Sequence, residues 1–286
     1  AARPASATAG ALDSAGTLLR AGLEWSGAGS LALDPQSLAT LQAFLQPGAA
    51  PGQAVRDGMA RALAAPDCAR VHTAFDADSG TLELRGHVAA AADRAPLLAS
   101  LREQIGGALE LRDRLQILPR PQCALLDAIS DLGLPQSEEQ LTDSDLVGEN
   151  AQVREYSFDA GDRLVIDLTA PDYPAYVRVD YFDASGQVLH LMPNERTPLR
   201  RFAPGEPFSI GRGDDLDLRI APPFGQDIAV AFGTSQPLTE PIRPLVEPAE
   251  PYLAALRDRV AAARAADPGF RGEWVYLFVA TSGANP

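Results

Sequence analysis

The sequence predicts an α+β chain built of two parts. The first is a small N-terminal α/β layer with the element order α-β-β-α-β-α, and the second is an antiparallel β-sandwich with one late helix and a closing strand. Three observations predict this class: the hydrophobic period changes from helical to alternating near residue 69, a polar and acidic stretch covers residues 133–150, and short apolar runs follow it at regular spacing. The expected units are a linker and N-terminal extension (1–30), the α+β domain (31–135) and the sandwich (150–286).

Two helices are expected at the start of the α+β domain. Asp34 is a suitable N-cap, and the apolar pattern that follows it stops at Pro47-Gly48. A second helix is expected from near Gln53, where apolar residues recur at four-residue spacing: Val55, Met59 and Leu63.

The rest of this domain is predicted to be a hairpin, a helix, a strand and a closing helix. Residues 69–75 and 81–88 alternate between apolar and polar, and the Asp- and Gly-containing segment between them is typical of a turn. Helical spacing then predicts a helix over 91–105, alternation a strand over 111–118, and apolar spacing a helix over 123–132.

Part of this pattern resembles the BON family of bacterial envelope modules. The strand Thr81–Val88 ends in Gly-x-Val, and the helix 93–105 and the strand 111–118 follow in the family's order, so the likeness covers residues 69–118. The resemblance implies a strand-strand-helix-strand core. It also implies an envelope or phospholipid-associated location more than any activity.

Beyond residue 150 strands dominate the pattern. Turn residues such as Asp-Ala-Gly-Asp and Asp-Ala-Ser-Gly separate the apolar runs, which is typical of an antiparallel sandwich. A Pro-rich passage then leads to an amphipathic helix over 252–265, and 274–281 reads as the closing strand. The expected strands before them are 153–158, 163–168, 176–182, 188–192, 207–210, 216–220 and 228–232.

Three blocks within residues 161–238 resemble an uncharacterised β-sandwich domain that follows bacterial Ser/Thr kinase and caspase-like peptidase domains. They are Gly161–Leu168, the hairpin Tyr176–Asn194 with its Pro-Asn end, and Ile220–Gly225 with its Pro-Phe-Gly turn. Arg178 and Asp180 depart from the family's apolar pattern. The resemblance implies no catalytic residue, because the family has none assigned.

Composition and charge exclude some classes of function. The chain has 286 residues, of which 46% are hydrophobic and 22% charged, which is typical of globular domains. Its net charge of -14 argues against a nucleic-acid partner, because phosphate binding needs a basic face. No apolar run is long enough to span a membrane. The absence of Lys is typical of a GC-rich bacterial gene, and the first residue, Ala1, favours a processed product or an excised fragment.

The two cysteines, Cys68 and Cys123, are expected to form a disulfide. Each lies at the boundary of a predicted element, and a bridge would close a loop of about 55 residues and stabilise the fold by about 3–4 kcal/mol. An oxidised pair indicates an extracytoplasmic protein. Two buried thiols in a cytosolic protein are the alternative.

No set of residues in the sequence predicts a metal, cofactor or catalytic site. Cys68 and His72 lack a second base, and the chain's three histidines, His72, His87 and His190, are too few for a histidine-rich metal centre. The segment Asp76–Gly80 resembles the start of a calcium loop but lacks its later ligands, so a hairpin turn is the simpler interpretation. The acidic loop residues Asp214, Asp215 and Asp217 are interpreted as a solvated turn.

Candidate recognition surfaces are the hairpin tip and the loops at one end of the sandwich. The Arg-Gly-Asp triplet at 212–214 is too short to carry meaning. Pro222, Pro223 and Phe224 are interpreted either as ligand contacts or as a hydrophobic plug beneath the loops, and none of them is predicted to be a site. Aromatic residues also gather around the first hairpin strand, either as core packing or as ligand contacts: Tyr173, Tyr176, Tyr181 and Phe182.

These observations favour a non-catalytic, extracytoplasmic binding protein. The first hypothesis is the ligand- or protein-binding sensor region of a bacterial membrane-bound Ser/Thr kinase, with a membrane tether upstream of residue 1. The second is a free-standing cell-envelope or secretion-system accessory protein. The third is an enzyme of unrecognised type. The expected partner is an envelope protein or a small ligand.

Overall fold

The computed structural model describes residues 18–22, 68–76, 79–105, 109–137, 155–212, 217–238 and 243–283. The fold over these residues is mixed α/β and rich in strands, which confirms the predicted class in this coarse form. The two helices expected from Asp34 and Gln53 lie outside the described residues. None of the helices described has both the length and the apolar character that crossing a membrane requires.

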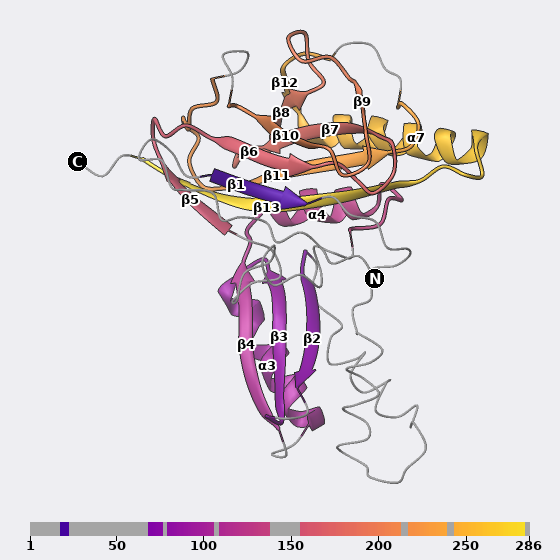
Figure 1. Ribbon diagram of the computed structural model, residues 1–286. Coiled ribbons are helices and arrows are strands. Elements are labelled where there is room, and N and C mark those ends of the chain that lie inside the picture. The colour runs from indigo at the N-terminus through magenta and orange to yellow at the C-terminus, as the bar shows by residue number, and fades with distance from the viewer. Residues whose placement is uncertain are drawn as a thin grey trace.

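A three-stranded sheet and one helix form the N-terminal layer, which lies below the larger sheet in Figure 1. β2 and β3 form an antiparallel hairpin, and β3 and β4 are parallel, so α3 is the crossover between them. This is the strand-strand-helix-strand order that the sequence predicts. The bounds are β2 (Arg70–Asp76), β3 (Thr81–Val88), α3 (Ala91–Ile105) and β4 (Glu110–Ile117).

The core of this layer is small and joins the sheet to α3. Leu84 of β3 and Leu101 of α3 are both fully buried in it. At Gly86 the backbone has φ +116°, and a Cβ there would lie 2.0 Å from the carbonyl oxygen of Arg70. The hairpin can therefore close only with glycine at this position.

A disulfide and the helix α4 (Gln122–Ser130) join the layer to the rest of the molecule. Cys68 before β2 and Cys123 in the first turn of α4 are bonded, the pair expected from the sequence. α4 was expected to close the N-terminal layer, and this is corrected: its buried residues belong to the larger core, with those of α7 and β11. The physical reason is that α3 already covers the three-stranded sheet.

The larger sheet contains seven described strands, of which β7 and β11 are central. Its order is β12-β8-β7-β11-β13-β5, and β9 pairs with β7. The strand bounds are β5 (Glu155–Asp159), β7 (Ala175–Phe182), β8 (Gln187–Met192), β9 (Arg201–Phe202), β11 (Gln226–Thr234), β12 (Val246–Pro248) and β13 (Gly272–Ser282).

A second, three-stranded sheet has the order β1-β6-β10. β1 lies within the region 1–30 that was expected to be linker and extension. The bounds are β1 (Leu18–Gly22), β6 (Val165–Thr169) and β10 (Pro207–Ile210).

Two details of the predicted sandwich are corrected. The pairings are not purely antiparallel, because β5 is parallel to β13 and β1 is parallel to β6. The expected strand at 216–220 is also wrong: residues 217–220 form backbone hydrogen bonds to 161–164 and a single bridge, Arg163 to Arg219, but no regular strand. Alternation of apolar residues predicts an extended segment, but it does not predict which segment will be its neighbour.

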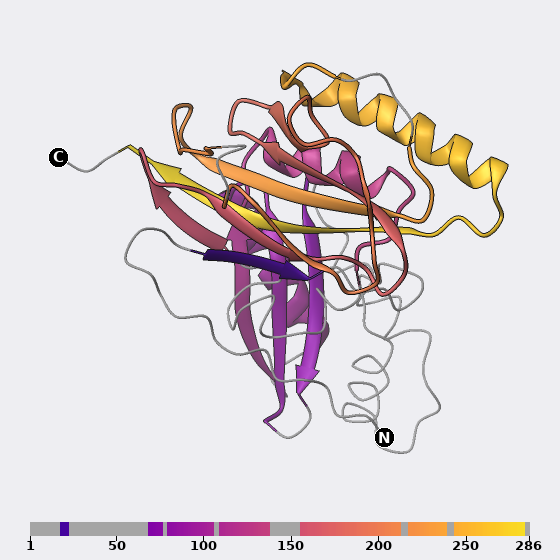
Figure 2. The same cartoon turned by 45° about the horizontal axis from the view of Figure 1, so that its top comes forward.

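The seven-stranded sheet is covered on both faces, as Figure 2 shows. On one face lies α7 (Ala249–Ala266), whose Tyr252 contacts Asp180 of β7. On the other face lies β6, whose Ile166 and Leu168 are near Val179 of β7. Asp180 and Val179 are adjacent in β7, and adjacent side chains of a strand point to opposite faces of the sheet. Helix α7 and strand β6 therefore lie on opposite sides of the sheet.

Candidate functional site

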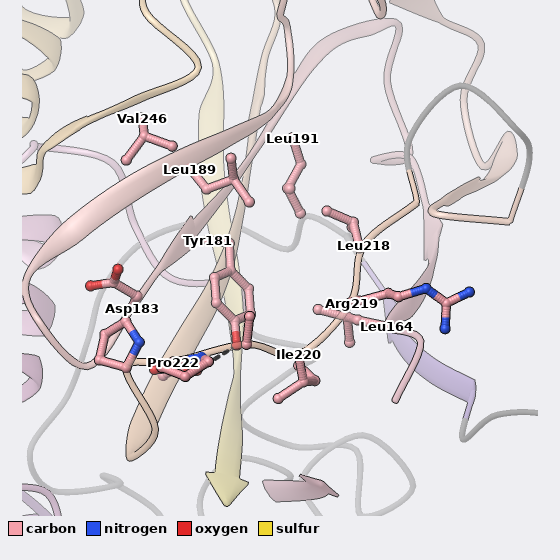
Figure 3. A pocket seen from close by; sticks show the side chains of 13 residues that line it. Leu164, Tyr181, Asp183, Leu189, Leu191, Leu218, Arg219, Ile220, Pro222 and Val246 are labelled. Carbon is pink, nitrogen blue, oxygen red and sulfur yellow. Dashed lines mark hydrogen bonds between the residues drawn. The ribbon is translucent and has the colours of Figure 1, made fainter. Parts of the chain in front are cut away.

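A cavity of about 180 Å³ lies between the β7–β8 hairpin and the segment 217–223. The face of the sheet that carries β6 forms its floor, and Val246 of β12 lies at its edge (Figure 3). Ala221, Pro222 and Val246 are exposed, so the cavity opens to solvent at this rim. We call it the Tyr181–Asp227 cavity, after the polar pair in its wall.

The wall of the cavity is mainly apolar. Its aliphatic side chains come from separate parts of the chain that only the fold brings together: one precedes β6, two lie on β8 and two lie on the segment after β10. They are Leu164, Leu189, Leu191, Leu218 and Ile220. Such a surface binds apolar groups because contact with it removes apolar area from water.

Tyr181 and Asp227 form a buried hydrogen-bonded pair in this wall. The Tyr181 hydroxyl donates to Asp227 Oδ2 at 2.5 Å, and Asp227 is 3% exposed. The pair crosses from β7 to β11 near the end of the sheet, where Thr281 Oγ1 of β13 lies 3.3 Å from the same carboxylate oxygen.

Burial raises the pKa of Asp227 from 3.8 to about 6, although hydrogen bonds from Tyr181, the Ala184 backbone and Thr281 favour the ionised form. Burial, followed by the neighbouring Asp227 carboxylate, also raises the pKa of the Tyr181 phenol. The carboxylate is therefore ionised at neutral pH, and the phenol keeps its proton.

The other charged residues of the wall are engaged elsewhere. Asp183 Oδ1 accepts hydrogen bonds from the backbone N–H groups of Ser185 and Gln187 and so closes the β7–β8 turn. Arg219 points away from Tyr181 in Figure 3, and its guanidinium donates to Asp217 at 2.9 Å and to the Gly161 carbonyl at 3.2 Å.

A second polar cluster lies on the opposite face of the same strand pair. Asp180 and His190 are buried side by side on β7 and β8, and Asp180 Oδ1 lies 2.6 Å from His190 Nδ1. His190 Nε2 lies 2.8 Å from Glu247 Oε1 of β12, and Arg243 Nη2 donates to Glu247 Oε2 at 2.7 Å. The Tyr252 hydroxyl of α7 donates to Asp180 Oδ2.

The charged groups of this Asp180–His190–Glu247 cluster pair with one another inside the fold and are not exposed to solvent for binding. Burial lowers the pKa of His190, but its hydrogen bonds to the two carboxylates and their charges outweigh this and raise it. The hydrogen bond from Arg243 is the main reason that the pKa of Glu247 is lowered. The cluster ties β7, β8 and β12 to α7, which is a structural role.

The structure separates the candidate residues of the sequence into different environments. Of the four aromatic residues around the first hairpin strand, Tyr181 lines the cavity and Phe182 is buried in the core. Tyr173 is buried, and its hydroxyl donates to the Gly233 carbonyl at 3.3 Å. Pro222 and Pro223, expected as a plug beneath the loops, lie instead at the exposed rim of the cavity.

The remaining candidates form no site in the described part of the chain. His87 is buried at 1% exposure, and Asp217 pairs with Arg219. Within the described ranges no group of three or more His, Cys, Asp or Glu side chains is arranged so that it could hold a metal ion. The side chains of His72 and Asp76, and the residues Asp214 and Asp215, lie outside what is described.

Sequence reasoning missed the two buried polar groups that matter most here. Asp180 and Asp227 are each the only carboxylate in a mainly apolar strand, and this is the signal by which the sequence could have revealed them. Asp180 stands out in the sequence only as a departure from a family pattern. Asp227 is separated from the Pro-Phe-Gly turn by Gln226, and the sequence does not show that Tyr181 faces it.

Comparison with known protein families finds one match. Residues 157–237 match a family described as a domain of unknown function (DUF4384), which covers well under half of the chain. Apart from Val246, every residue lining the Tyr181–Asp227 cavity falls within this match. The predicted resemblance to an uncharacterised domain is thereby confirmed in this coarse form. Searches of curated proteins and of solved structures each return no match.

Proposed function

We propose that the chain is a non-catalytic binding module and that its C-terminal part, a β-sandwich, holds a small, mainly apolar ligand in the Tyr181–Asp227 cavity. The observation that carries this proposal is the cavity itself, an apolar wall of about 180 Å³ with one polar pair in it. Small-molecule sites combine these two features, because apolar surface supplies affinity and a few polar groups set orientation.

The size of the cavity limits the ligand. An apolar protein cavity of about 150 Å³ is large enough to bind benzene. The Tyr181–Asp227 cavity therefore fits a molecule built on a single ring, or on an aliphatic chain of similar volume.

A binding role is favoured over catalysis because the polar side chains of the wall are already hydrogen-bonded within the protein. Tyr181 donates to Asp227, Asp183 closes a turn, and Arg219 is held by Asp217. Burial raises the pKa of the Tyr181 phenol, so it keeps its proton and is not activated as a nucleophile.

The module is proposed to act outside the bacterial cytoplasm. The disulfide between Cys68 and Cys123 supports this location, because such bonds persist in oxidising compartments. The resemblance of residues 69–118 to an envelope module supports it as well. On the resemblance of residues 161–238, we propose that the chain is the sensor region of a membrane-bound Ser/Thr kinase, in which ligand binding alters association of the extracytoplasmic part.

Calorimetric titration of the protein with toluene and with benzyl alcohol tests the cavity. We expect saturable binding with a Kd of about 1 mM or tighter for at least one of them. Ala221 is exposed at the rim, so Ala221→Trp blocks entry without disturbing the core and weakens binding at least about tenfold.

The matched control for this variant is Leu245→Trp. It adds the same ring at an exposed residue that does not line the cavity, and its binding should equal that of the unaltered protein. If Ala221→Trp binds either compound as well as the control does, the cavity is not the ligand site.

The proposed extracytoplasmic location and the proposed association with a kinase are tested separately. Protein taken from its native cell and analysed by mass spectrometry without reduction should carry the bond between Cys68 and Cys123. Free thiols at both positions would contradict an extracytoplasmic location. The gene upstream of residue 1 should encode a kinase domain and one membrane span, and a signal peptide alone would contradict the kinase assignment.

A further inference from the structure

The polar groups in the wall of the Tyr181–Asp227 cavity are hydrogen-bond acceptors. The Tyr181 hydroxyl has one proton and donates it to Asp227, so its oxygen is left with acceptor capacity only. Within the described part of the chain, Asp227 Oδ1 is buried without a hydrogen bond of normal length and angle. The hydrogen bonds from Tyr181 and Thr281 both go to Oδ2, so Oδ1 keeps acceptor capacity for a ligand that donates a hydrogen bond.

The charge of the cavity is negative. Asp227 is ionised at neutral pH because its pKa of about 6 lies below 7, and Asp183 of the β7–β8 turn adds a second carboxylate to the wall. Arg219 is the only cationic residue among the described lining residues, and its guanidinium is held outside by Asp217 and Gly161. No lining cation is therefore placed to neutralise Asp227 from within the cavity.

We propose that the ligand of this cavity is a small amine, an apolar ring or chain that carries a single ammonium group, with the ammonium bound by Tyr181 and Asp227. This inference rests on the proposed function and specifies its ligand class. The apolar body contacts the leucine side chains of the wall. The ammonium donates to the Asp227 carboxylate and to the Tyr181 oxygen, which together supply the acceptors that it needs.

An ammonium fits this site better than a neutral donor or an anion. A hydroxyl has one proton to donate and no charge to set against Asp227, whereas an ammonium has three protons to donate and a positive charge that attracts the carboxylate. A ligand carboxylate would place a further negative charge beside the carboxylates of Asp227 and Asp183, which is unfavourable in a partly desolvated cavity.

Four compounds of the same size separate these cases: benzylamine, benzyl alcohol, toluene and benzoate. Their affinities for the protein are measured by calorimetric titration at pH 7.5. We expect benzylamine to bind at least about tenfold tighter than benzyl alcohol or toluene, and benzoate to bind least.

Two variants test the residues assigned to the ammonium. Asp227→Asn keeps the shape of the side chain and removes its charge, so the preference for benzylamine over benzyl alcohol should disappear while benzyl alcohol still binds. Tyr181→Phe removes the phenolic oxygen and should reduce the preference by a smaller factor. The matched control is Asp258→Asn on the exposed surface of α7, which should leave all four affinities unchanged.

The outcomes distinguish this inference from the proposed function. If benzyl alcohol and toluene bind but benzylamine binds no better, the ligand class is wrong and the cavity remains a binding site. The ligand class is equally wrong if Asp227→Asn keeps the preference for benzylamine while its circular dichroism spectrum matches that of the unaltered protein. If none of the four compounds binds, both the cavity function and the ligand class fail.

Discussion

Asp180 Oδ1 and His190 Nδ1 lie 2.6 Å apart across β7 and β8, and both side chains are almost completely excluded from solvent. The second ring nitrogen of His190 meets Glu247, so the imidazole lies between two carboxylates, whose hydrogen bonds and charges raise its pKa. This pairing explains how an aspartate occupies a strand position where an apolar residue was expected. The charge is compensated by a partner ten residues away in the chain and by Tyr252 of α7.

The first prediction concerns the pH dependence of this cluster. The pKa of His190 is raised in the folded protein, so its stabilising contribution is complete below the unfolded value of about 6.5 and is lost as the pH rises through the folded value. The groups that face the ring are Asp180, Glu247 with its partner Arg243, and Tyr252. His190→Gln should lower the free energy of unfolding by about 3–5 kcal/mol at pH 6.

Urea unfolding at pH 5 to 9 measures this effect. The unaltered protein should lose stability above about pH 6.5, and the His190→Gln protein should lose less over the same range. Arg257→Gln, a change in an exposed ion pair of α7, serves as the control and should lie within about 0.5 kcal/mol of the unaltered protein. Parallel curves for His190→Gln and the unaltered protein would show that His190 is not charged in the fold.

The second prediction concerns Asp227. Its pKa is raised from 3.8 to about 6 in the folded protein, so folding favours the protonated form, and this contribution to stability is lost as the pH rises from about 4 through about 6. The difference between the two pKa values corresponds to about 3 kcal/mol. The ionisable groups beside the carboxylate are Tyr181 and Asp183.

Asp227→Asn does not ionise, so its stability should fall less between pH 4 and pH 7 than that of the unaltered protein. Chemical unfolding at these two pH values measures the difference, and Asp258→Asn on exposed α7 is the matched control. An equal fall in Asp227→Asn and in the control would contradict the buried environment assigned to Asp227.

The third prediction concerns the β2–β3 hairpin. Gly86→Ala places a methyl group 2.0 Å from the Arg70 carbonyl oxygen at a backbone φ of +116°, so we expect a loss of about 3 kcal/mol or more. Gly80→Ala is the control, because Gly80 has φ +65° and open space around the new methyl group, and it should cost only about 1–2 kcal/mol. Thermal unfolding of both variants measures the contrast, and equal losses would argue against the close approach at Gly86.

The fourth prediction concerns the disulfide. Replacement of Cys68 and Cys123 by Ala together opens a cross-link over a sequence separation of 55 residues, and the loop-entropy model gives a loss of about 4 kcal/mol. The unaltered protein in a strong reductant should lose stability to a similar extent, whereas the double variant should not respond to reductant. A reductant effect of equal size in both proteins would show that it does not act through this bond.

The local pattern of apolar, polar and turn residues predicted those helices and strands that pack against segments close to them in the sequence. The β2–β3 hairpin, α3, β4 and the β7–β8 hairpin all appear near their expected bounds, because alternation, turn residues and helical spacing act over short distances. Helix α7 and strand β13 were expected for the same reason, and each extends beyond its predicted limits by one to three residues at either end.

Pairing between distant segments could not be predicted in the same way. β5 lies beside β13, more than one hundred residues later, and their parallel register depends on which edge of the sheet is left uncovered. The short strands β9 and β12 have too few residues for a recognisable period. The packing of α4 against α7 likewise depends on which sheet face remains to be covered.

By itself the sequence determined the strand-rich class, the cysteine pair and the acidic, globular character of this protein, because composition and periodicity are properties of the chain alone. Only the tertiary structure decided that Tyr181 meets Asp227 in a cavity and that Asp180 meets His190 on the opposite face. The physical reason is that a buried carboxylate is stable only beside a partner. The packing of strands supplies that partner, and the spacing of residues along the chain does not predict it.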